Sequence, residues 1–190
     1  MTIVDRVKNI LITPKTDWPV IAGESTSTAD LLKNYVAPLA AIPAVCGFVG
    51  GSLIGFGAFR VPFAAGLGGA IFTYVMSFVS VFVMAFIINA LAPTFASEKS
   101  DSQAMKLTAY SFTASWVGGV FSLIPGLGIV GVLCSLYGVY LLYLGLPKLM
   151  KCPEDKAVGF TFAILVAAIV LSLVIGAIVA AVIGGAAYRM

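Results

Sequence analysis

Residues 157–188 read AVGFTFAILVAAIVLSLVIGAIVAAVIGGAAY, a stretch of 32 positions without a charged side chain. About 18 or more consecutive apolar residues are enough for a helix to cross the hydrocarbon core of a bilayer. A charged side chain near the bilayer centre costs at least ~2.5 kcal/mol on insertion scales, so spanning helices avoid charge. This stretch therefore predicts a transmembrane helix over about 158–185.

Three further uncharged stretches come earlier in the chain, at 34–59, 61–97 and 107–147. The first two each predict one helix, because nothing in the middle of the second breaks a helix. The third contains Pro125-Gly126-Leu127-Gly128, a run that ends helices and permits a tight turn, so it predicts two short helices. The fold class is thus all-α, a polytopic membrane protein with five spans at about 35–58, 65–91, 106–124, 129–146 and 158–185. The hairpin over 106–146 either spans fully or is re-entrant, and the sequence leaves both open.

The composition agrees with a membrane protein. Hydrophobic residues make up 61% of the chain and charged residues 10%, and the mean hydropathy is +1.08. Such values lie outside the usual range of soluble domains. We expect one membrane domain over 34–188, preceded by a cytoplasmic region over 1–33. No secretory signal is evident, so we expect the first span to direct insertion and to stay in the mature protein.

The basic residues predict the orientation. With the N-terminus inside, five spans place two basic residues outside, Arg60 and Arg189, and nine inside. An excess of Lys and Arg on the cytoplasmic side is the usual rule for membrane proteins. The sequence therefore predicts a cytoplasmic N-terminus and an outer C-terminus. The nine inside are Arg6, Lys8, Lys15, Lys33, Lys99, Lys106, Lys148, Lys151 and Lys156.

The first residues carry a different pattern. Ile3, Val4, Val7, Ile10 and Leu11 recur at helical spacing, opposite polar and charged positions that include Arg6 and Lys8. With Thr2 as a cap and Pro14 as the end, this predicts a short amphipathic helix on the cytoplasmic leaflet. Trp18 suits the headgroup zone, and Pro19 would begin another short helix. The alternative is an ordinary helix packed on the cytoplasmic ends of the spans.

Small residues at a spacing of four predict close helix packing in two spans. Such residues let helix backbones approach each other in lipid. The packing is either within the five-helix domain or between copies in a homo-oligomer, and the spacing does not choose. The residues are Gly47, Gly51 and Gly55 in the first span and Gly176, Ala180 and Gly184 in the last.

The interior carries no recognisable reaction centre. The chain has no histidine, and no acidic or basic residue lies deep inside a predicted span. Proton relays, intramembrane metal sites and activated serine nucleophiles each need such groups, and no Gly-x-x-x-x-Gly-Lys phosphate motif is present. We therefore expect no enzymatic activity, no metal, no cofactor and no nucleic-acid partner.

Two segments, with the order of the predicted elements, resemble a known family. Residues 30–38 read DLLKNYVAP, and residues 135–157 read SLYGVYLLYLGLPKLMKCPEDKA. Residues 9–14 read NILITP and are followed by Trp18. Together with five spans, these segments resemble the bacterial branch of the Yip family, which is named for proteins that interact with Ypt/Rab GTPases. The Asp-Leu start at residue 30 lacks the Tyr-Gly-Pro continuation typical of eukaryotic members.

The resemblance implies five transmembrane helices and a cytoplasmic N-terminus. In eukaryotes it implies roles in vesicle trafficking through GTPases and membrane-shaping partners. A bacterial member, expected in the inner membrane, has no Rab system, so the identity of a partner does not carry over.

Two functions follow as hypotheses. The first is a non-enzymatic scaffold or adaptor that contacts lipid or a protein partner through its cytoplasmic face. The second is a small oligomeric transporter or channel for a neutral or lipidic solute, with the hydroxyl-rich third span and the Pro125 break as its path. The residues expected on the contact face of the adaptor are Arg6, Lys8, Trp18, Lys148, Lys151 and Lys156.

Overall fold

The structure is a computed structural model that describes residues 1–55, 60–124 and 126–187, with side-chain surroundings as far as residue 177. Within these ranges every regular element is helical. Short π-helical turns, η1 (Leu32–Val36) and η2 (Val49–Ile54), flank α4, and 3-10 turns, η3 (Ala92–Phe95) and η4 (Gly119–Leu123), follow α5 and α7. The α-helices are α1 (Ile3–Ile12), α2 (Pro14–Gly23), α3 (Thr28–Leu31), α4 (Ala37–Phe48), α5 (Phe63–Leu91), α6 (Asp101–Ser111), α7 (Thr113–Gly118), α8 (Gly128–Leu149) and α9 (Glu154–Ala187).

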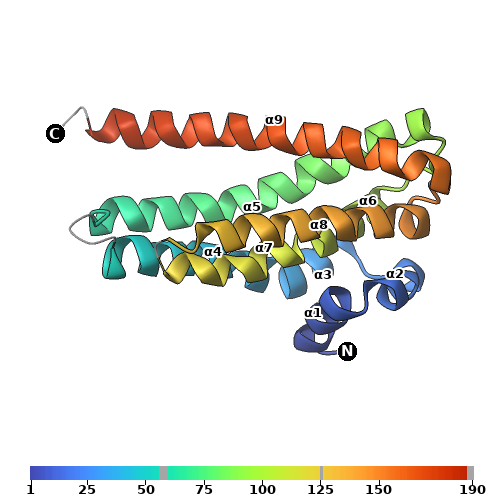
Figure 1. Cartoon of the computed structure of the whole chain (residues 1–190), viewed down its shortest axis with the longest axis horizontal. Helices are drawn as coiled ribbons and strands as arrows, with labels where there is room; N and C mark the ends of the chain where they lie inside the picture. The colour runs from blue at the N-terminus through green and yellow to red at the C-terminus, as the bar shows by residue number, and fades with distance from the viewer. Residues whose placement is uncertain (56–59, 125, 188–190) are drawn as a thin grey trace.

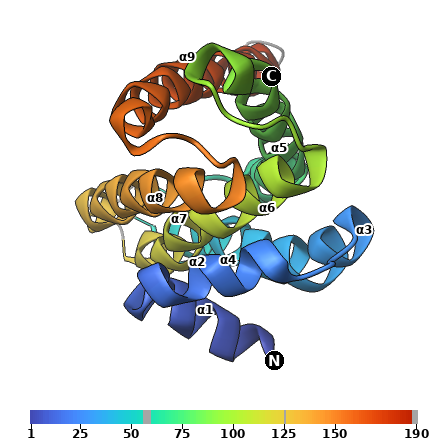
Figure 2. The same ribbon diagram turned by 90° about the vertical axis from the view of Figure 1, so that its right-hand side faces the viewer.

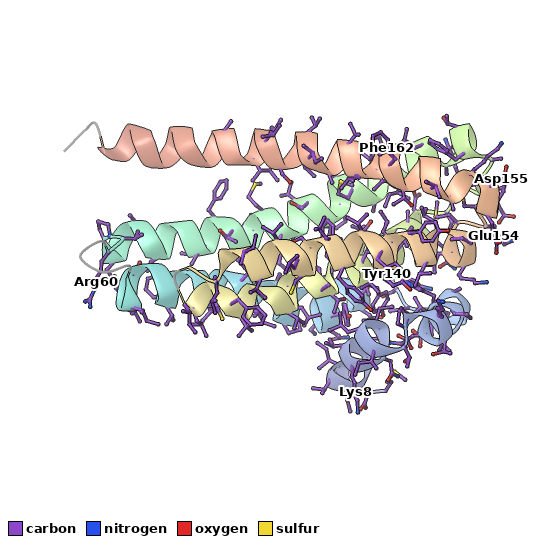
Figure 3. The ribbon with its side chains drawn as sticks, viewed as in Figure 1. Lys8, Arg60, Tyr140, Glu154, Asp155 and Phe162 are labelled. Atoms are coloured by element: carbon purple, nitrogen blue, oxygen red, sulfur yellow. The ribbon has the colours of Figure 1, made fainter. Side chains whose placement is uncertain are left out.

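The long helices run roughly side by side between two ends of an elongated bundle (Figure 1). One end, called the charged end below, holds the loops over 92–100 and 150–153; Glu154 and Asp155 lie there, and Arg60 lies at the opposite end (Figure 3). At the charged end the Glu98 N–H donates a hydrogen bond to the Met150 carbonyl at 2.8 Å, which joins the two loops. The N-terminus lies in the half of the bundle nearer the charged end, whereas α9 runs to the opposite end (Figure 1).

Four helical segments among the described residues are long and apolar enough to cross a membrane. These candidate helices overlap the spans predicted at 35–58, 65–91, 129–146 and 158–185, although residues 56–58 lie outside the described residues. The first begins seven residues before its predicted start, because the Ser27 hydroxyl accepts from the Asp30 N–H and caps a continuous helix. The four are Thr28–Ile54, Phe63–Phe95, Gly128–Leu149 and Glu154–Ala177.

The predicted span over 106–124 is not among these four, so the count of five stays a prediction. Here the chain forms α6, a turn at Phe112, the short helix α7 and the 3-10 turn η4. Thr108 and Thr113 donate their hydroxyls to carbonyls four residues earlier, a pattern that bends helices. Residues 104–111 are all buried, so this polar segment is enclosed by protein rather than exposed to lipid.

The bounds of the N-terminal helices differ from their prediction in one respect. The Thr2 cap is confirmed, since Thr2 and Asp5 form a reciprocal capping box at the start of α1. Pro14 ends α1 and is also the first residue of α2, whereas Pro19 lies inside α2 instead of starting a helix. Proline at the first helical position loses no hydrogen bond, which explains why α2 begins at Pro14.

The hydrophobic core lies toward the charged end. Along α5 its buried members are Val81, Met84, Ala85 and Ile88, and along α9 the last is Ile164. Phe95 and Phe160 stack there, with ring centroids 4.7 Å apart. Toward the opposite end, large side chains on both helices are exposed, among them Phe63, Ile71 and Leu173.

The closest glycine contacts are not those that the spacing of four predicted. A Cβ on Gly50 would overlap the backbone of Ser122 in η4, whereas Gly47 has only the Ser122 hydroxyl at 3.9 Å. Gly55 ends η2 with a φ of 74°, a left-handed position that favours glycine. No atom lies within 4 Å of a Cβ on Gly176.

The other predicted packing residues add little to these contacts. A Cβ on Gly51 would meet the Val61 side chain at an ordinary 3.6 Å. Ala180 and Gly184 belong to α9, but their surroundings lie outside the described side chains. The glycine that follows Pro125, Gly126, has a φ of 104° and turns the chain before α8, while Pro125 itself lies outside the described residues.

Candidate functional site

A buried ionic cluster joins α1 and α2 at the charged end. An Arg6 guanidinium nitrogen lies 2.9 Å from a carboxylate oxygen of Asp17, and a second nitrogen pairs with Glu24. The side chains of Arg6 and Asp17 are nearly inaccessible to solvent, while Glu24 is partly exposed. Removing one partner of a buried charge pair leaves the other charge buried and uncompensated, which strongly destabilises the fold. These contacts therefore hold α1 against α2.

The pKa values of Arg6 and Asp17 are both shifted within the cluster. Burial alone would lower the pKa of Arg6, but the carboxylates of Asp17 and Glu24 outweigh it and raise that pKa. Burial raises the pKa of Asp17, and the Arg6 charge offsets only part of this shift. Arg6 therefore stays charged, while the pKa of Asp17 stays above its ordinary value.

Tyr110 of α6 lies at the centre of the contact between the N-terminal helices and the membrane domain. The Arg6 guanidinium lies over its ring, 5.7 Å from the centroid, and the Trp18 ring meets it edge-on at 6.3 Å. The Tyr35 ring packs on it at 4.6 Å, and the Tyr35 hydroxyl hydrogen bonds with that of Thr113 at 2.7 Å. These aromatic and cation–π contacts connect the ionic cluster to the interior of the bundle.

Polar side chains of α6 donate hydrogen bonds to backbone carbonyls at the end of α2. Gln103 donates to the Ala22 carbonyl at 3.0 Å, and the Lys106 ammonium donates to the carbonyls of Ile21 and Glu24. The last carbonyls of a helix have no partner within the helix, so these donors fix where α2 ends. Lys106, predicted to lie at the start of a span, is thus buried against the N-terminal region.

The helix α1 lies against α2 and α7 on the side of the bundle rather than across its end, and α2 packs on α8. The Tyr137 hydroxyl donates to the Leu11 carbonyl at 2.7 Å. Tyr137 precedes the last residue of α8 by 12 positions, which corresponds to ~18 Å of helix. Figure 2 shows α1 and α2 together on the side of the bundle opposite to α9.

Trp18 and Arg6 are buried, which changes their predicted role. Trp18 has 0% exposure and contacts Gly145 of α8, where an added Cβ would lie 2.9 Å from the indole. Its ring is therefore covered by protein and does not lie among headgroups. The helix α2 is thus packed against α8. Neither side chain is available to an outside partner, because the ionic cluster and α8 enclose them.

The other predicted contact residues are exposed: Lys8, Lys148, Lys151 and Lys156. Lys8 lies on the N-terminal helices at the outside of the molecule (Figure 3). Lys151 pairs with Glu98 at 2.8 Å between two exposed side chains. The exposed face of α1 also carries two large apolar residues, Val4 at 70% and Ile12 at 68% exposure.

The sequence prediction missed Asp17 and Glu24 as partners of Arg6, and Tyr110 and Lys106 as contacts of the N-terminal helices. Two acidic residues within reach of Arg6 along two short helices were the available signal for the ion pairs. Nothing in the sequence connects Arg6 with Tyr110, since the two residues are more than 100 positions apart.

A second feature is an elongated cavity of about 730 Å³, called the slot below. None of the described residues that line it is charged. Its walls come from four parts of the bundle: α5 between Phe72 and Ile88, α6–α7 between Thr108 and Trp116, α8 between Ser135 and Leu142, and α9 between Ile164 and Gly176. Eight hydroxyl residues line it: Thr73, Ser77, Ser80, Thr108, Ser111, Ser115, Ser135 and Ser172. The hydroxyls of the predicted solute path, Ser111 and Ser115, are among them.

Neither feature holds the parts of a metal-dependent or nucleophilic reaction centre. Within the described part of the chain no three His, Cys, Asp or Glu side chains lie together as a metal-binding group. The charged groups of the ionic cluster pair with each other, and the slot offers hydroxyls without a neighbouring base. The arrangement is suited to holding helices together and to binding an apolar molecule.

The comparisons with known proteins agree over nearly the whole chain. Residues 8–188 match the Yip1 domain. Two curated relatives are described as inner membrane protein YohC, from Escherichia coli strain K12 and from E. coli O6:H1 strain CFT073. Each is 26% identical over 185 residues, which cover 93% of this chain and 94% of the relative. No solved structure matches the chain. The chain is therefore a transmembrane protein that belongs to the Yip1 domain family.

Proposed function

We propose that the protein is a non-enzymatic scaffold or adaptor in a bacterial inner membrane. In this proposal the charged end faces the cytoplasm and the C-terminus lies outside. The description of the relatives as inner membrane proteins supports the location, and the excess of basic residues at the charged end supports the orientation. The partner is lipid, a second copy of the chain, or another protein of the membrane or the cytoplasm.

The observation that carries this proposal is the docked N-terminal surface. The ionic cluster, Trp18 and the Tyr137–Leu11 hydrogen bond fix α1 and α2 against the membrane domain. A surface held in one arrangement binds a partner without the entropy cost of ordering it first. This surface, called the platform below, presents Val4, Lys8, Ile12, Lys15 and Val20 outward.

The chemistry of the platform suits contact rather than reaction. Its exposed apolar side chains would gain from burial against a partner or the leaflet surface. Each exposed lysine adds attraction to an anionic partner, worth ~1 kcal/mol near an anionic leaflet. We expect Lys148, Lys151 and Lys156 at the same end to contribute through charge.

In-cell photo-crosslinking tests the proposal. A photoreactive residue placed at Val4, Lys8 or Ile12 should capture one reproducible protein at near-stoichiometric yield. Phe162 is the matched control, because it is 66% exposed on α9, away from the platform (Figure 3). Recovery of lipid alone from the platform positions, or of the same proteins from Phe162, would contradict an adaptor for a specific protein.

Charge reversal tests whether the three lysines between the end of α8 and the start of α9 contribute to the contact with a partner. Changing Lys148, Lys151 and Lys156 to Glu, with the topology checked by cysteine accessibility, should reduce recovery of the captured protein. Unchanged recovery would remove these three lysines from the contact surface, while leaving the crosslinking result for α1 as a separate test.

A further inference from the structure

We propose that the leaflet surface nearer the charged end meets the bundle at the level of α1, where Lys8, Lys15 and Lys33 contact anionic headgroups. In this placement the bundle is tilted, and on the side of α6 and α8 its charged end stands outside the hydrocarbon. The inference does not rest on a protein partner, because α1 would lie at this level whether or not the platform binds one.

The charges of α1 exclude this helix from the hydrocarbon. It packs on α2 and α7 at the side of the bundle, and its exposed face carries Asp5 and Lys8. Lipid tails around these two side chains would be strongly unfavourable. The hydrocarbon beside the bundle must therefore end before it reaches α1. Figure 2, viewed along the long helices, shows α1 extended across the view, an orientation roughly parallel to a leaflet.

The exposed side chains of α8 mark the same boundary. Its large exposed side chains are aliphatic at four positions from Ile129 to Leu136, and they are then tyrosines, at Tyr140 and Tyr143. Tyrosine is enriched where membrane proteins cross the headgroup layer. Tyr137, whose hydroxyl donates to the Leu11 carbonyl of α1, lies at this change. The docked helix and the exposed tyrosines thus place the headgroups at one level of α8.

The first span shows that one hydrocarbon thickness fits between α1 and the opposite end. The Tyr35 ring packs on Tyr110, over which Arg6 of α1 lies, so Tyr35 marks the level of α1. From Tyr35 to Ile54 this helix covers 19 residue steps, or ~28 Å, close to the ~30 Å of a hydrocarbon core. Arg60 lies beyond it at the opposite end (Figure 3). The charged end is left over on the other side of α1.

This placement accounts for the polar character of α6. The helix starts at Asp101 in the charged end, and Gln103 and Lys106 precede Tyr110. Both side chains therefore lie between the level of α1 and the charged end, outside the hydrocarbon. A buried lysine at this position needs no partner within the membrane, because backbone carbonyls of the docked α2 accept its hydrogen bonds.

The opposite side of the bundle lies deeper in the membrane. On α9, Val158 and Phe162 are 65% and 66% exposed, so the apolar surface begins four residue steps from the start of the helix. On α8 it ends at Tyr140, nine steps from Leu149. The difference of five steps is ~8 Å along the axis. Across two helix diameters, ~20 Å, it corresponds to a tilt of about 20°, which is common for transmembrane helices.

The charge beside α1 suits anionic headgroups. Lys8, Lys15 and Lys33 are exposed. The two exposed carboxylates of residues 1–33, those of Asp5 and Asp30, accept hydrogen bonds from Thr2 and Ser27 at helix starts. Each exposed lysine near an anionic leaflet adds attraction, which falls off within a Debye length of ~8 Å.

Depth measurements on spin-labelled variants test the level and the tilt. In nanodiscs, with the three native cysteines changed to serine, single nitroxides replace Leu136, Tyr140 or Phe162. Accessibility to oxygen and to a water-soluble nickel chelate should place the Tyr140 label among the headgroups. The Leu136 and Phe162 labels, each four steps inside the boundary, should lie ~6 Å within the hydrocarbon. A Tyr140 label deep in the hydrocarbon, or equal depths for Tyr140 and Phe162, would overturn the proposal.

Lipid enrichment tests the contact with headgroups. A fluorophore at Thr13, on a cysteine replacing it in the same background, reports quenching by headgroup-labelled phosphatidylglycerol relative to phosphatidylcholine. Changing Lys8, Lys15 and Lys33 to Gln should reduce the preference for the anionic lipid about fivefold or more, the equivalent of at least one lysine.

The matched control carries the same change of charge at the charged end. Lys148, Lys151 and Lys156 changed to Gln should leave the preference within about twofold, because Lys148 lies eight residue steps, or ~12 Å, beyond Tyr140. An unchanged preference in the first triple variant, or equal losses in both, would overturn the proposed headgroup contact.

Discussion

The two halves of the bundle are built differently. Toward the charged end, α5 and α9 bury Val81, Ile88, Phe160 and Ile164, and an ionic cluster adds α1 and α2. Toward the opposite end, the same two helices separate around the slot and expose Ile71 and Leu173. One helix can therefore be fixed by protein contacts along part of its length and left to lipid along the rest. The predictions below test this division.

The largest expected effect concerns the ionic cluster. Arg6→Ala should cost about 3–5 kcal/mol in the free energy of docking α1 and α2, because it leaves the Asp17 carboxylate buried without its partner. Hydrogen exchange of α1 and α2 in nanodiscs measures this loss. The control Lys8→Ala, on the exposed face of α1, should change nothing. Changing Arg6 to Met together with Asp17 to Leu should restore most of the protection.

The next effect concerns the packed part of α9. Phe160→Ala should lower the free energy of unfolding by about 3 kcal/mol, since it deletes a fully buried ring stacked on Phe95. Phe162→Ala, two positions away and exposed, should change it by less than about 0.5 kcal/mol. Denaturant titration in mild detergent measures both. Equal losses would show that the core of the charged end extends around α9.

A smaller effect concerns glycine contacts in α8. Gly145→Ala should cost about 1–3 kcal/mol of stability, because the new Cβ would press on the Trp18 indole. Gly131→Ala, in the half nearer the opposite end, meets no atom within 4 Å and should gain up to ~1 kcal/mol from helix propensity. Thermal unfolding of the two variants compares the halves directly, and a stabilising Gly145→Ala would contradict close packing of α2 on α8.

The smallest effect concerns the exposed pair at the charged end. Lys151→Ala should change the free energy of unfolding by no more than about 1 kcal/mol, because the pair with Glu98 is open to solvent. Glu98→Ala should give the same small value, and 0.5 M salt should reduce it further. A larger loss would show that the loops over 92–100 and 150–153 depend on this pair and not on their backbone hydrogen bond.

The sequence predicted most reliably what hydropathy alone determines. Four long apolar helices match predicted spans and the Thr2 cap is present, because a long apolar run and a local capping box depend on neighbours in sequence. The third segment was harder to place, since α6 and α7 are hidden by other helices and can carry Lys106 and several hydroxyls without meeting lipid. Trp18 was misplaced for a related reason: its cover comes from Gly145, 127 positions later. The close approach at Gly50 likewise depends on Ser122, which no spacing in the first span reveals.

The contacts of the N-terminal helices also have a consequence for synthesis. Residues 1–24 are complete long before Tyr110, Tyr137 and Gly145 are made. From residue 24 to residue 145 a ribosome adds 121 residues, which takes roughly 6–24 s at ~5–20 residues per second. During that interval Arg6, Asp17 and Trp18 have each other but no bundle to dock on. The order of translation thus makes the N-terminal helices among the last parts of the protein to reach their final position, although they are the first to be made.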